Sequence, residues 1–443
     1  MTIQLSDHFT YKKLIRFVLP SIIMMIFTSI YSVVDGLFVS NFVGKVPFAA
    51  VNLILPFVMI LGSVGFMLGT GGSALVAKTL GEGHKEKANQ YFSFLIIVAL
   101  VSGIVFAVLG IAFLKPIATL LGAEGEMLAY CVVYGRILLL ALPAFMLQNM
   151  FQSFLVTAEK PNVGLAITVA AGLTNIVLDA FFIAVLDLGI IGAAAATAIS
   201  QMIGGIIPLI YFARKNKSLL KFTKTQFMGD VLIKASSNGA SEFLTNVSMS
   251  LVCMLYNFQL MRMVGENGIA AYGVIMYVQF IFLAIFIGYS IGTAPLIGFN
   301  FGASNHKELK NVLKKSLILI TLSGIVLMIT AFIGSNPLAK VFVGYDQELF
   351  ELTARGFKFY AVSFLLCGFS IFGSAFFTAL NNGLISAVIS FLRTVVFQVA
   401  AVLILPIFLG IDGVWSAISV AEFLALIVTI ILLVKFKNKY HYA

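Results

Sequence analysis

The sequence predicts an all-α integral membrane protein with about twelve transmembrane helices, arranged as two six-helix lobes that are related by a pseudo-two-fold axis along the membrane normal. Three observations predict this fold. Of the 443 residues, 60% are hydrophobic and only 10% are charged, which is too little polar surface to cover a water-soluble globule of this length. Apolar stretches of about 20 residues, the length that crosses a bilayer, recur between short polar interruptions. A shift of about 221 residues, half the chain, also brings matching residues together.

The expected helices run from one polar interruption to the next. In the first half of the chain they cover residues 14–40, 47–77, 91–113, 127–155, 162–186 and 190–213. In the second half they cover residues 236–262, 268–301, 310–335, 350–379, 383–409 and 413–436. The first stretch lacks a small-residue cleavage site and is too long for the apolar region of a signal peptide, so we expect it to be retained as a helix.

The internal repeat defines two lobes. Under the shift, Val43-Gly44 falls on Val264-Gly265 and Gly189-Ile190 falls on Gly410-Ile411. The tripeptide His-Lys-Glu occurs at 84–86 and again, one residue out of register, at 306–308, so the residues that follow it are offset by 222. Six spans in each half is an even number, so both halves enter the membrane from the same side and the repeat is parallel. We therefore expect an N-lobe at 1–212, a cytoplasmic linker at 213–235 and a C-lobe at 236–443, with a substrate cavity between the lobes.

The net charge of +10 does not indicate a nucleic-acid partner, because the basic residues gather in alternate loops. The linker alone contains Arg214, Lys215 and Lys217. This bias follows the positive-inside rule and predicts that both termini are cytoplasmic. We expect a multi-pass protein of the cell inner, or plasma, membrane that acts as a monomer among membrane lipids.

The sequence contains no pattern typical of an enzyme. The three cysteines, at 131, 253 and 367, are scattered without a pairing motif, so we expect neither a disulfide framework nor a metal site built from them. The four histidines lie in expected loops or tails. No phosphate-binding loop, HExxH or GxGxxG motif is present, so we expect no cofactor and no ATP hydrolysis by this chain.

Polar groups of the first half fall at similar depth within the expected spans. Asp35 lies about five residues, or roughly 8 Å, inside the outer end of the first helix. Asp179, with Asn175 one turn away, and Thr197 lie at comparable depth in the fifth and sixth helices. Ionisable groups in hydrocarbon are costly and indicate function. Together these oxygens suit Na⁺, whereas crowded carboxylates would carry a proton instead; pairing of each Asp with backbone or a nearby amide is the structural alternative.

The other charges within the spans are more ambiguous. Glu242 lies about six residues into the seventh expected helix, where it is either a solvated carboxylate or a further coupling or substrate residue. Arg393 and Glu422 fall near mid-membrane on neighbouring helices, which predicts a structural ion pair. The role of Arg136 in the fourth helix stays open.

Several stretches resemble a known transporter family. Leu19-Pro20, Asp35 within SIYSVVDGLFVSNFVG and the run FAAVNLILP are similar to the start of MATE multidrug and toxic compound extrusion transporters. The stretch NIVLDAFFIAVLDLGIIGAAAATAIS, at 175–200, resembles their fifth and sixth helices, and LGIDGVWSAISVAEF resembles their eleventh and twelfth, closest to the bacterial branch.

The resemblance implies a secondary antiporter that exports cationic amphiphilic drugs or toxic compounds in exchange for inward Na⁺ or H⁺ by alternating access. It also implies that Asp35, Asn175, Asp179 and Thr197 form the cation-coupling site and that the first helix bends at Pro20. Glu242 resembles the seventh-helix acid of another branch. Its tenth-helix companion is missing, because the stretch 363–369 contains no carboxylate. A lipid-linked precursor flippase of the same superfamily is an alternative, as is a non-transporting membrane receptor or an intramembrane enzyme.

Overall fold

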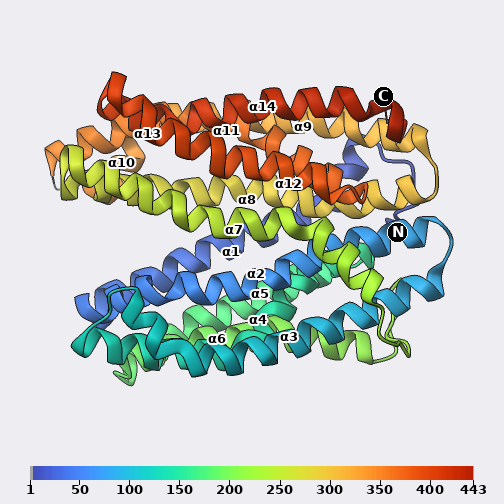
Figure 1. The fold of residues 1–443 in the computed structure, drawn as a ribbon, viewed down its shortest axis with the longest axis horizontal. Coiled ribbons are helices and arrows are strands. Elements are labelled where there is room, and N and C mark those ends of the chain that lie inside the picture. The colour runs from blue at the N-terminus through green and yellow to red at the C-terminus, as the bar shows by residue number, and fades with distance from the viewer. Residues whose placement is uncertain (1–2, 345, 443) are drawn as a thin grey trace.

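The computed structural model describes residues 3–344 and 346–442 and consists of a bundle of long helices (Figure 1). Within these residues, twelve helical segments are long and apolar enough to cross a membrane. The prediction of an all-α membrane protein with about twelve spans is therefore confirmed. Both termini lie at the same end of the bundle, which we call the terminal face; the other end is the opposite face (Figure 1).

The helix boundaries lie close to those expected from hydropathy. The first half contains α1 Tyr11–Phe38, α2 Lys45–Gly81, α3 Lys85–Leu120, α4 Gly125–Thr157, α5 Pro161–Asp179 and α6 Gly189–Ala213. The second half contains α7 Gly229–Val264, α8 Glu266–Gly302, α9 His306–Ile333, α10 Ser335–Val343, α11 Gln347–Ala379, α12 Gly383–Phe391, α13 Gln398–Leu409 and α14 Ile411–Tyr440. The short helix α10 was not expected from the sequence, and α7 begins seven residues before the expected start of the seventh span.

Short π-helical segments extend three of the spans: η1 Val39–Val43 follows α1, η2 Ala180–Val185 follows α5, and η3 Leu392–Phe397 joins α12 to α13. A π turn inserts an extra residue into the α-helical ladder and often occurs at functional sites. Here η2 begins directly after Asp179 and η3 contains Arg393. Hydropathy could not predict these segments, because they change the backbone pattern without changing the apolar content of the span.

The repeat is visible in the backbone at the glycines that join consecutive helices. Gly44 and Gly265, which correspond under the shift of about 221 residues, have φ angles of 108° and 72°. Gly189 and Gly410, also a corresponding pair, have φ angles of 55° and 60°. Only glycine adopts these conformations without strain, which explains why the same residue occupies both members of each pair.

The two lobes pack closely near the terminal face. A Cβ atom added to Gly81 of α2 would lie 2.0 Å from the carbonyl oxygen of Phe299, and one added to Gly302 of α8 would lie 2.0 Å from that of Lys78. The two contacts exchange under the 221-residue shift, so the pseudo-two-fold axis passes between the ends of α2 and α8. Helix α7 also approaches α2, because a Cβ on Gly239 would lie 1.9 Å from the Met67 carbonyl oxygen.

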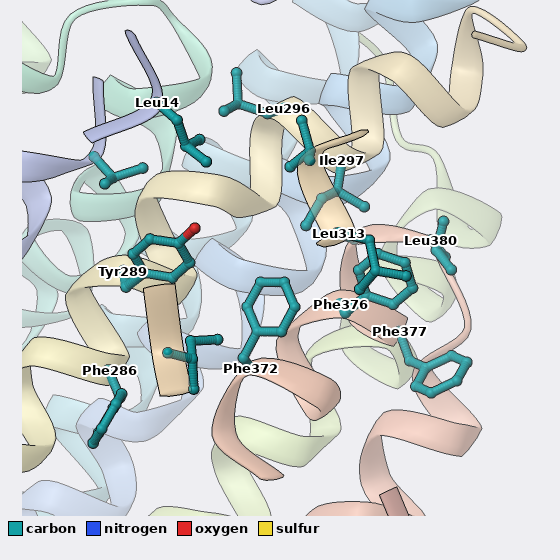
Figure 2. Close-up of a cluster of buried hydrophobic side chains, with 14 of the residues drawn as sticks. Leu14, Phe286, Tyr289, Leu296, Ile297, Leu313, Phe372, Phe376, Phe377 and Leu380 are labelled. Carbon is teal, nitrogen blue, oxygen red and sulfur yellow. The ribbon is translucent and has the colours of Figure 1, made fainter. Parts of the chain in front are cut away.

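Helix α1 contributes to both lobes. Near the terminal face it packs on α8, where a Cβ added to Gly292 would lie 2.9 Å from Cβ of Val18. Further along, Phe27 and Tyr31 pack against Gly172 of α5. The C-lobe core accordingly includes side chains from the start of the chain: Figure 2 shows Leu14 in one cluster with residues of α8, α9 and α11.

Candidate functional site

A buried polar cluster lies in the N-lobe where α5 passes into η2. Asp179 is the last residue of α5 and is fully buried, Asn175 lies one turn earlier and is 1% exposed, and Asp35 of α1 is half-buried. The Asp35 carboxylate faces the side chains of both Asp179 and Thr197, and Thr197 lies in the third turn of α6. The structure thus brings together residues from three helices, α1, α5 and α6.

Five polar atoms of this cluster are buried and have no hydrogen-bond partner among the described residues. Both carboxylate oxygens of Asp179, Oδ1 of Asp35, Nδ2 of Asn175 and Oγ1 of Thr197 are buried and unpaired. Leaving a buried polar group unsatisfied costs about 1–3 kcal/mol, and more when the group is charged. Two facing carboxylates cannot satisfy each other when both are ionised, so the cluster is suited to hold a cation or a proton.

Two tyrosines that were not among the expected site residues lie near the carboxylates. Tyr134 of α4 is 1% exposed and faces both Asp35 and Asp179, while Tyr31 of α1 faces Asp35 and Gln148. Aromatic residues are abundant throughout this chain, so no local signal in the sequence distinguished these two tyrosines. Their proximity depends on α4 packing beside α5 and α6.

A second site is a cavity of about 290 Å³ between the lobes. Most of its lining comes from α7, α8, α11 and the η3–α14 region of the C-lobe, and Phe66, Thr70 and Ser153 are among the residues that the N-lobe contributes. The lining mixes methionine, aromatic and hydroxyl side chains, a combination typical of adaptable ligand pockets. None of the four residues of the N-lobe cluster lines this cavity, so the two sites are separate.

Glu242 lines the cavity and has neither a hydrogen-bond donor nor an ion-pair partner for its carboxylate among the described residues. Because α7 begins at Gly229, this residue lies about 20 Å along the helix at 1.5 Å per residue. From the sequence we expected this residue close to the cytoplasmic end of its helix, because the helix was expected to begin at residue 236. The structure places the side chain inside the cavity.

Arg393 and Glu422 also line the cavity and contact each other. Nη2 of Arg393 lies 2.7 Å from Oε1 of Glu422, and Nε donates to both carboxylate oxygens at 2.8 and 2.9 Å. The two side chains are 14% and 4% exposed. This pair neutralises itself, whereas the Glu242 carboxyl in the same cavity makes no ion pair with a described residue.

Two further residues from the sequence, a proline and an arginine, belong to neither site. Pro20 is buried inside α1, whose helix continues on either side of it. Arg136 of α4 is exposed.

The chain is similar to known proteins over nearly its whole length. The family model described as MatE matches residues 20–181 and 242–404. The multidrug export protein MepA of Staphylococcus haemolyticus is 28% identical over 434 residues, which covers 97% of this chain and 94% of that protein. The corresponding protein of Staphylococcus saprophyticus is 26% identical, over 93% of this chain and 91% of its own.

Solved structures show the same fold. A structure described as the outward-facing conformation of a multidrug resistance MATE family transporter of the MOP superfamily superimposes with a TM-score of 0.93 at 23% identity, over 99% of this chain and 98% of that one. A MOP superfamily transporter from Pyrococcus furiosus gives a TM-score of 0.91 at 23% identity, over 98% and 97%.

Proposed function

The chain belongs to the MatE family, and from this premise we propose that it is a secondary active antiporter that exports cationic amphiphilic drugs or toxic compounds in exchange for inward Na⁺ or H⁺. The observation that supports this proposal best is the pair of neighbouring carboxylates of Asp35 and Asp179, three of whose oxygens are buried without a hydrogen-bond partner among the described residues. Relatives named as multidrug export proteins over nearly the full chain length support the same activity.

The N-lobe cluster is the proposed coupling site. A cation bound between Asp35 and Asp179 would satisfy carboxylate oxygens that have no donor among the described residues. The Thr197 hydroxyl and the Asn175 side-chain amide would complete the site. A single shared proton would relieve the same repulsion. Either ion stabilises the arrangement of α1, α5 and α6 in which the cluster is closed, so binding and release would bias the N-lobe between two shapes.

The cavity between the lobes is the proposed substrate site. Its apolar walls would accept an amphiphilic body, and the unpaired carboxylate of Glu242 would attract a positively charged group. Methionine and aromatic side chains such as Met249 and Tyr272 adapt to varied shapes and favour cations over their ring faces. We assign Glu242 to substrate binding or to a further coupling step.

Alternating access requires the lobes to separate in turn at each face. The close glycine contacts of α2, α7 and α8 close the terminal face in this structure. The basic loops are expected to be cytoplasmic, so in the cell inner membrane this arrangement would be closed to the cytoplasm. We propose that α1, which packs on both lobes, bends at Pro20 when the terminal face opens, because the proline lacks one helical hydrogen bond.

The test uses purified protein in proteoliposomes that contain a fluorescent cationic dye, with a Na⁺ gradient or a proton gradient imposed separately. Asp179→Asn keeps the side-chain shape and removes the charge, so we expect gradient-driven dye transport to fall at least ten-fold. The matched control is Asp187→Asn in the exposed loop before α6, where φ is 51° and asparagine is tolerated. Dye accumulation by Asp179→Asn at the wild-type rate under both gradients would contradict the proposal.

A further inference from the structure

The segment before α1, residues 3–10, crosses from one lobe to the other at the terminal face, and we call it the N-terminal strap. Its backbone is held by the N-lobe at one point, because the Leu5 amide donates a 2.7 Å hydrogen bond to Glu159 Oε1 between α4 and α5. The side chains of Leu5 and Phe9 are nevertheless fully buried in the hydrophobic core of the C-lobe.

Polar side chains of α9 hold the other end of the strap. The Phe9 amide donates to Glu308 Oε1 at 2.9 Å, and His8 Nδ1 lies 2.7 Å from Glu308 Oε2. The Phe9 carbonyl accepts hydrogen bonds from Asn311 Nδ2 at 3.0 Å and from Lys315 Nζ at 2.7 Å. Charged groups thus bind both the donor and the acceptor of one peptide backbone position, which makes these bonds stronger than neutral ones.

The repeat shows that only the strap is anchored by a buried glutamate. Glu308 corresponds to Glu86, the last residue of the other His-Lys-Glu tripeptide, at the start of α3. Glu86 is exposed, whereas the Glu308 side chain is only 6% exposed because the strap covers it. The glutamate at this helix position therefore contacts the strap in the C-lobe, whereas its equivalent in the N-lobe contacts solvent.

The linker that precedes α7 docks on α3 in a related way. The Lys221 amide donates to Asn89 Oδ1 at 3.0 Å and the Thr223 amide donates to Ser93 Oγ at 2.9 Å. Asn89 and Ser93 correspond in the repeat to Asn311 and Lys315, which bind the strap. Each lobe's first helix is thus preceded by a segment that binds the third helix of the opposite lobe. The strap differs in that α9 holds it with charged side chains.

We propose that the N-terminal strap is a latch that holds the terminal face closed, and that Glu308 is its principal anchor. This inference rests on the proposed function, since alternating access requires this face to open. Separation of the lobes must break either the bond to Glu159 or the set of bonds to α9. The strap therefore stabilises the state that is closed at the terminal face relative to the state that is open there.

The test measures the opening of the terminal face directly. In a background without the three native cysteines, Ala77→Cys places a thiol on α2 where it is fully buried against Gly298 of α8. A membrane-impermeant maleimide applied at the terminal face can modify this thiol only when the lobes separate there. Glu308→Ala removes the contacts with the Phe9 amide and with His8. Loss of one charge-assisted hydrogen bond corresponds to an about ten-fold change in an equilibrium constant, so we expect this variant to increase the modification rate by at least about ten-fold.

Glu86→Ala is the matched control and should leave the rate at its wild-type value, because that side chain is exposed and binds no strap. If Glu308→Ala does not yield folded protein on gel filtration, Asn311→Ala removes one donor to the strap and should give a smaller increase. Equal rates for Glu86→Ala and the folded strap variant would overturn the latch. Failure of the proposed function would give a different result. If the protein were not a coupled antiporter, an imposed Na⁺ or proton gradient would not change the rate at which the maleimide modifies the cysteine at position 77 in the otherwise wild-type protein.

Discussion

Glu422→Gln should destabilise the protein strongly, because it leaves the guanidinium of Arg393 without its counter-ion. Three contacts of 2.7 to 2.9 Å join the two side chains, and they are only 14% and 4% exposed. Removing one partner of a buried pair costs about 3–5 kcal/mol, mostly because the remaining charge is stranded. Arg393 keeps limited access to the cavity, so we expect about 3 kcal/mol, at the lower end of this range.

The assay is a double-mutant cycle on the free energy of unfolding, measured by SDS titration of protein in mixed micelles. The variants are Glu422→Gln, Arg393→Met and the double substitution. Removing both charges should bring the protein back to within about 1 kcal/mol of wild type, since an apolar replacement of a whole buried pair is often neutral. Two results would refute the reasoning. One is a free energy of unfolding of the single variants equal to that of wild type; the other is a loss of unfolding free energy in the double variant equal to the sum of the two single losses.

Two further predictions concern the terminal face. Gly239→Ala would place a Cβ 1.9 Å from the Met67 carbonyl oxygen, so it should cost about 1–3 kcal/mol in unfolding free energy, whereas Gly273→Ala, which meets nothing within 4 Å, should cost nothing. Burial raises the pKa of the Glu159 carboxyl, so the folded protein holds this proton more tightly than the unfolded chain, and stability falls as the pH rises through that range. Glu159→Gln keeps the acceptor for the Leu5 amide but does not titrate, so it should become more stable relative to wild type as the pH rises. The measurement is the free energy of unfolding of both proteins across the acidic range. A difference between them that does not change with pH would contradict this prediction.

The sequence by itself determined the class of fold and its internal repeat. A chain this apolar has to place its backbone in helices within lipid, because each unpaired backbone group there costs several kcal/mol. Helix ends could be read from polar interruptions and from glycines such as Gly44 and Gly265, whose positive φ angles require that residue. The depth of Asp35 and Asp179 followed from counting residues along helices, which rise by a fixed length.

Only the tertiary structure decided which groups lack partners and which helices cross between lobes. The exposed Glu86 and the buried Glu308 occupy equivalent positions in the sequence, and the strap packed over one of them makes the difference. Hydropathy also could not place Glu242 in a cavity, because the wall around it comes from both lobes. Contacts between residues hundreds of positions apart depend on how the helices pack, and an apolar helix pattern is compatible with many packings.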